Sequence, residues 1–74
     1  MLDAVGMREI DKIFAVTDAI GVHREMLVIP LGPATPGRVR KLPSGKIEII
    51  VDATEPIDEW VKRLPEMIRA ATGA

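Results

Sequence analysis

The sequence predicts one small α+β domain in which a helix, three short strands and a second helical region follow one another over residues 1–74. Three observations support this order. Apolar residues recur at helical spacing near both ends of the chain, an apolar run ends at a proline, and two alternating segments flank a turn sequence. The expected sheet is three-stranded and largely antiparallel, with both helices on one face.

The first helix is predicted from about residue 4 to residue 20. Asp3 is placed to cap its start, and Gly21 suits a left-handed C-terminal cap. The apolar spacing should turn one face of this helix toward the sheet. The residues expected on that face are Met7, Ile10, Ile13, Phe14, Thr17 and Ile20.

The middle of the chain predicts a strand followed by a loop. The run from Met26 to Ile29 is continuously apolar and ends at Pro30, which is typical of a strand covered on both faces. Residues 32–37 then contain two prolines and two glycines, so we expect no regular structure there.

The clearest local signal is a β-hairpin. Residues 38–42 and 46–51 flank a Pro-Ser-Gly turn. Pro43 presets the first central dihedral of a type I turn, and Gly45 accepts the positive φ of the bulge that follows. On the second arm one face should carry Ile47, Ile49 and Val51, and the other Lys46, Glu48 and Ile50.

The last helical region is predicted to begin after Thr54, a suitable N-cap, with Pro56 in its first turn. A proline inside a continuous helix costs about 3 kcal/mol, so Pro65 predicts a kink or two shorter helices joined at Leu64. The expected apolar stripe comprises Ile57, Trp60, Val61, Leu64, Met67, Ile68 and Ala71.

Large aliphatic residues are expected on both faces of the sheet, but the helices cover one face alone. We therefore predict a homodimer or a protein partner over the second face. A monomer with an exposed apolar patch is the alternative. The residues expected to contact the partner are Trp60, Met67, Ile50 and Val28.

Composition restricts the chemistry of the chain. Cysteine is absent and His23 is the single histidine, which excludes disulfides, thiol catalysis and zinc sites built from thiolates or several histidines. We predict no catalytic residue, metal or cofactor. The net charge is −1, and no apolar stretch approaches the roughly 20 residues of a membrane span. No signal peptide is expected, so the predicted location is the cytoplasm.

Four basic residues gather on the predicted hairpin without an intervening acid: Arg38, Arg40, Lys41 and Lys46. Arg38 and Arg40 share a strand face, where two guanidinium groups can bind adjacent phosphates. The competing interpretation is that these charges keep an edge strand from aggregating. Nucleic-acid binding is therefore the alternative function.

Other polar residues have simpler explanations. The acidic residues Asp52, Glu55, Asp58 and Glu59 lie near the start of a helix, where the helix dipole favours negative charge. A small hydrolase that uses Glu66 or His23 is the last-ranked function, because no nucleophile motif accompanies either residue.

The segment from Leu42 to Asp52, followed by a short acidic link and a helix, resembles the strand-to-helix region of zincin-like metallopeptidases related to ImmA/IrrE. The resemblance implies a related scaffold. The catalytic HExxH motif of that family is absent: residues 61–69 stand where the metal-binding helix would run, and Glu66 has no histidine on either side. No functional residue is carried over.

The leading functional prediction is a non-enzymatic protein-binding or regulatory module that associates with itself through an apolar sheet or helix surface. Nucleic-acid binding through residues 38–46 is the alternative. A small hydrolase or a degenerate metallopeptidase-like scaffold comes last.

Overall fold

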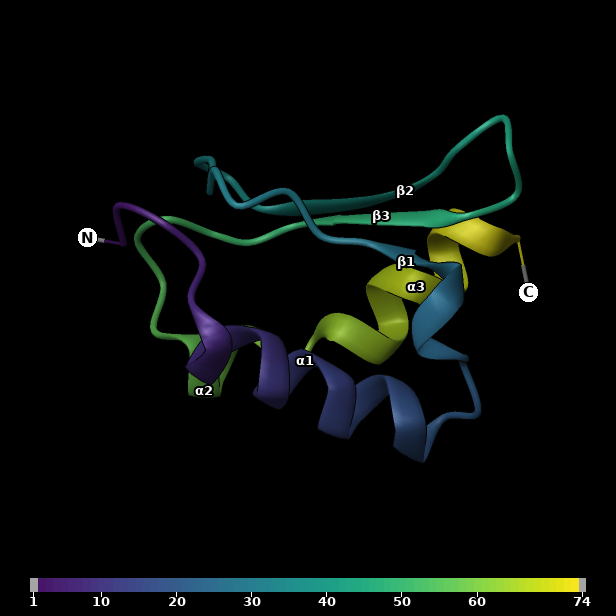
Figure 1. Cartoon of the computed structure of the whole chain (residues 1–74), viewed down its shortest axis with the longest axis horizontal. Coiled ribbons are helices and arrows are strands. Elements are labelled where there is room, and N and C mark those ends of the chain that lie inside the picture. Colours follow the sequence, from purple (N-terminus) through teal and green to yellow (C-terminus); the bar gives the residue numbers. More distant parts are fainter. Residues whose placement is uncertain (1, 74) are drawn as a thin grey trace.

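The computed structural model describes residues 2–73 and confirms the α+β class and the predicted order of elements (Figure 1). A short 3-10 turn precedes the first strand, and the second helical region is divided in two. The elements are α1 (Met7–Ala19), η1 (Arg24–Met26), β1 (Leu27–Val28), β2 (Arg38–Lys41), β3 (Ile47–Ile50), α2 (Ile57–Trp60) and α3 (Leu64–Thr72).

The sheet has the strand order β1-β3-β2 and is mixed. β2 pairs with β3 antiparallel, as expected, whereas β1 pairs with β3 parallel. After β1 the chain continues beside β3 as far as a bridge between Ala34 and Asp52. It then passes the end of β3 and returns along the opposite edge as β2. The parallel pair arises because residues 29–37 carry the chain from one edge of β3 to the other.

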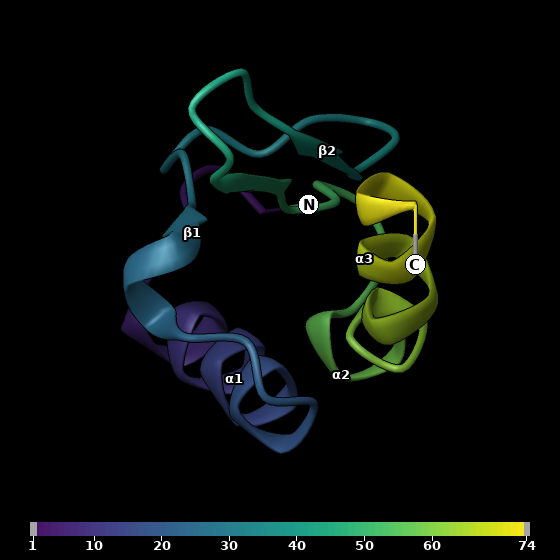
Figure 2. The ribbon, with the colours of Figure 1, turned by 90° about the vertical axis from the view of Figure 1, so that its right-hand side faces the viewer.

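Both long helices lie beneath the same face of the sheet, as the ribbon shows from its end (Figure 2). α3 contacts β2, and α1 contacts α2 and α3. Between the two layers the buried apolar side chains form one cluster. Its members are Val5, Ile13, Ile47, Ile49, Val51, Ile57, Trp60, Leu64 and Ile68.

α1 begins later than the sequence predicted. Its N-cap is Gly6, whose N–H donates to Glu9 Oε1 at 2.8 Å, so Asp3 lies outside the helix and does not cap it. The buried face is formed by Glu9, Ile13 and Thr17. Met7 and Ile20, expected on that face, are 67% and 42% exposed. The helix begins at Met7 rather than near residue 4, because the buried carboxylate of Glu9, at the third position of the helix, accepts the N–H of the N-cap residue.

The hairpin turn has the predicted geometry. Gly45 N–H donates to Leu42 O at 2.9 Å, and Leu42 N–H donates to Lys46 O at 2.8 Å. Gly45 has a φ of 89°, the positive value that the bulge requires. On β3, Ile47 and Ile49 are buried whereas Glu48 and Ile50 are half-buried, so the predicted alternation is also confirmed.

The predicted break in the last helical region is also present. Pro65 lies in the first turn of α3, where its missing N–H removes no helical hydrogen bond. α2 ends at Trp60, and Leu64 begins α3. Within residues 2–73, no helix has the length and apolar character needed to cross a bilayer.

Candidate functional site

The four residues predicted to contact a partner do not form one surface. Trp60 is 1% exposed and belongs to the core, so the prediction that it contacts a partner is corrected. Its stripe packs against the sheet of the same chain. Val28 and Ile50 are half-buried on the sheet face away from the helices, and Met67 is half-buried on α3.

The outer face of the sheet mixes apolar and charged side chains. Across the strands Val28 neighbours Glu48, and Glu48 neighbours Arg40. Arg40 Nε donates to Glu48 Oε1 at 2.6 Å, so an ion pair lies beside the aliphatic groups. Ile50 likewise lies directly opposite a charged residue, Arg38. The second face is therefore less apolar than the sequence suggested.

A groove of about 350 Å³ runs between the edge of β2 and the C-terminal half of α3. On its strand side lies the outer edge of β2, with which no strand pairs among residues 2–73. Leu42 N–H donates to Lys46 O, and along an antiparallel pair of strands hydrogen-bonded and non-hydrogen-bonded residue pairs alternate. The N–H and C=O groups of Val39 and Lys41 therefore point away from β3. The residues that line the groove are Gly37, Arg38, Val39, Met67, Ala70 and Ala71.

Seven of the ten lysines and arginines form ion pairs within residues 2–73, and the other three all lie on the hairpin. These three are Arg38, Lys41 and Lys46, which are exposed. Of the predicted phosphate-binding pair, Arg40 is engaged by Glu48 and Arg38 is not. The seven pairs are Arg8 and Lys12 with Asp58, Arg24 with Asp18, Arg40 with Glu48, Lys62 with Glu59, Arg63 with Glu55, and Arg69 with Glu66.

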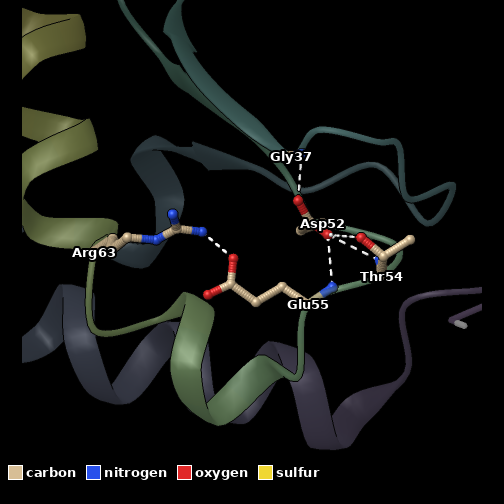
Figure 3. Close-up of polar contacts among 5 residues, drawn as sticks. All are labelled: Gly37, Asp52, Thr54, Glu55 and Arg63. Carbon is tan, nitrogen blue, oxygen red and sulfur yellow. Dashed lines mark hydrogen bonds and ion pairs between the residues drawn. The ribbon is translucent and has the colours of Figure 1, made fainter.

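Asp52 holds the start of β2 against the end of β3 (Figure 3). Its Oδ2 accepts from Gly37 N–H at 3.0 Å, and its Oδ1 accepts from the N–H groups of Thr54 and Glu55, both at 2.8 Å. These donors, with Gly37 the strongest, hold the pKa of Asp52 far below its ordinary value. The predicted cap Thr54 is instead a donor to Asp52. The spacing of an aspartate two and three residues before these N–H groups is the signal that could have found this turn.

Gly37 makes a close backbone approach where β2 passes the end of β3. A Cβ at this position would lie 2.5 Å from Asp52 N and 2.8 Å from Ile50 O. The groove thus begins at a point where any side chain larger than hydrogen would push β2 away from β3.

The predicted acidic cluster does not converge. Asp52 is used in the turn just described, Glu55 pairs with Arg63 (Figure 3), and Asp58 pairs with Lys12. Glu59 pairs with Lys62. No three His, Asp or Glu side chains come together as a metal site in the part of the chain that the structure describes.

The two residues considered for a hydrolase, His23 and Glu66, do not line a common pocket within residues 2–73. His23 lines an open depression of about 580 Å³ beside Asp18 and Arg24, and no hydroxyl side chain is among the lining residues. Arg24 stacks over the Phe14 ring and bonds to Asp18, which lowers the pKa of that carboxyl group. Glu66 pairs with Arg69 on α3 and does not line this depression.

Comparison with known proteins adds no relative. No protein-family model, no curated protein and no solved structure matches this chain.

Proposed function

We propose that the protein is a non-catalytic binding module that takes an extended segment of a partner protein along the free edge of β2. The observation that carries this proposal is the groove between β2 and α3. It joins an unpaired strand edge to a wall made of small and flexible apolar side chains, Ala70, Ala71 and Met67.

An unpaired strand edge is a template for another strand. The outward N–H and C=O groups of Val39 and Lys41 supply backbone hydrogen bonds to any extended peptide, whatever its sequence. The groove supplies the selective part of the interaction, because an inward side chain of the added strand would pack on Met67 and Ala70. Strand addition thus uses both features that meet at this edge.

Self-association remains a prediction at a different surface. Two β2 edges brought together would oppose Arg38 and Lys41 with the same cations, and like charges on paired strands are destabilising. The outer sheet face, with Val28 and Ile50, is the surface that we expect in a homodimer. Such a dimer leaves the β2 edge free.

Nucleic-acid binding is the second candidate, favoured by the three hairpin cations that have no acidic partner in the described part of the chain. It predicts affinity for single-stranded oligonucleotides that falls steeply with added salt and with Lys46→Glu. Nucleic-acid binding is weakened as an alternative by the absence of an aromatic residue on the hairpin for base stacking.

Selection of peptides from a random displayed library tests the proposed function. Peptides selected on the wild-type protein should lose binding to Ala70→Trp, since the indole fills the groove. The matched control is Ala15→Trp, which adds the same side chain at an exposed alanine of α1. Selected peptides that bind both variants equally well would contradict the proposal.

A further inference from the structure

We infer that the segment bound at β2 is acidic and adds to the sheet as a fourth strand, an inference that rests on the proposed function. Arg38 and Lys41 lie on the edge strand itself and have no acidic partner among residues 2–73. Carboxylates on the incoming strand would form ion pairs with these two side chains. A second copy of β2 would instead oppose them with like charge.

The register of the hairpin defines the expected pattern of the partner. Arg38 lies opposite Ile50 and points to the outer face, whereas Val39 and Lys41 lie opposite Ile49 and Ile47 and point to the helix side. An added antiparallel strand would therefore place one acid opposite Lys41 and another opposite Arg38, three residues later. The residue facing Val39 enters the groove and should be apolar.

Arg40 sets a limit on this pattern. Its guanidinium group is already held by Glu48 on the neighbouring strand, whose side chain is 14% exposed. The partner residue opposite Arg40 therefore needs no charge. The expected motif is acid, any residue, apolar residue, acid, read along a strand antiparallel to β2.

The test is a fluorescence-anisotropy titration of the full chain at low ionic strength with the labelled peptide Thr-Thr-Glu-Thr-Val-Glu-Thr-Thr. Two altered peptides accompany it. One has glutamine at both glutamates, and the other carries N-methyl groups on the amides of the first glutamate and the valine, which would face β2. We expect at least a tenfold loss of affinity for each altered peptide.

Variants of the protein identify the site. Arg38→Glu combined with Lys41→Glu, and separately Ala70→Trp, should each weaken the parent peptide at least tenfold. Arg8→Glu, a charge reversal at an exposed residue of α1, and Ala15→Trp should leave its affinity unchanged. Circular dichroism confirms that each variant is folded; Arg38→Gln with Lys41→Gln serves as the milder pair.

The contrary results separate the two levels of the proposal. If the glutamine peptide binds as tightly as the parent and Ala70→Trp weakens both, the acidic partner is wrong while the binding module stands. If the N-methylated peptide binds as tightly as the parent, strand addition is wrong. An oligo-dT that binds more tightly than any peptide, with no effect of Ala70→Trp, assigns the cations to nucleic acid and overturns the inference.

Discussion

Asp52 is the residue on which the geometry of the site depends most. It is 8% exposed, and its two oxygens together accept four hydrogen bonds that join the beginning of β2, the end of β3 and the turn before α2. A charged acceptor with several backbone donors contributes more than a neutral one. The groove therefore depends on a carboxylate that does not line it.

The stability of the protein should depend on pH through Asp52. Because its folded pKa lies below the ordinary value near 3.9, the carboxylate stabilises the fold above about pH 4, and this contribution is lost as the pH falls below that value. Asp52→Asn presents an amide N–H₂ to a second donor, so it should lower the free energy of unfolding by about 2 kcal/mol at pH 7.

Urea unfolding of the wild type and Asp52→Asn at pH 7 and pH 3 measures this effect. The difference between the two proteins should shrink at pH 3, because there the Asp52 carboxylate of the unfolded chain binds a proton while that of the folded chain stays ionised. An equal difference at both values would show that the carboxylate charge adds nothing.

The sequence did not show which of two nearby polar side chains accepts the hydrogen bonds of a turn or a helix start. Thr54 and Asp52 both have side chains that cap backbone N–H groups, and the chain uses Asp52 because the same carboxylate also reaches Gly37. Glu9 lies between the apolar positions of α1 in the sequence, yet its buried carboxylate supplies the cap of that helix. These outcomes depend on contacts across the fold, which local spacing does not contain.

At the scale of elements, the passage of β2 past the end of β3 places one strict demand on the chain. Gly37→Ala would put a Cβ within 2.5 Å of the backbone of Asp52. We expect a loss of about 2 kcal/mol in the free energy of unfolding, in the range of overpacking, and weaker binding at the groove.

Gly32→Ala is the matched control for Gly37→Ala, because a Cβ at residue 32 meets no atom within 4 Å. Thermal unfolding should find this control within about 0.5 kcal/mol of the wild type. Equal melting temperatures for the two variants would show that β2 shifts without cost and that the crossing does not fix the edge.

The elements that could be predicted were those with their own local signals. The hairpin followed from Pro43 and Gly45, and the helix break followed from Pro65, since each proline or glycine restricts the backbone directly. The parallel pairing of β1 could not be predicted, because an apolar run identifies a strand and not its neighbour. Met67 was identified as a surface candidate, whereas Ala70 and Ala71 carry no pattern that marks a groove.

At the scale of the whole molecule, the residues that are buried and those that are exposed differ from the prediction of an apolar partner surface that includes Trp60. Trp60 fills the core, and among residues 2–73 none of the large apolar residues that are exposed belongs to β2 or β3. These are Met7, Ile20, Met26 and Leu31. An amphipathic stripe shows that a face is buried but not whether the covering surface belongs to the same chain, which explains why Trp60 was misplaced.

The oligomeric state tests the remaining prediction for the outer face. Light scattering coupled to size exclusion should give the mass of a dimer for the wild type and of a monomer for Ile50→Glu, which places a carboxylate opposite Arg38. Met7→Glu, at an exposed residue on α1 rather than on the sheet, is the control and should not change the mass. A wild-type monomer would remove self-association.

The central claim is that the free edge of β2 accepts a strand, and amide hydrogen exchange followed by NMR tests it most directly. The N–H groups of Val39 and Lys41 point away from β3, while that of Arg40 points toward Glu48. On addition of Thr-Thr-Glu-Thr-Val-Glu-Thr-Thr, exchange should slow at least tenfold at Val39 and Lys41 and little at Arg40. Unchanged exchange at both residues under saturating peptide would contradict the account.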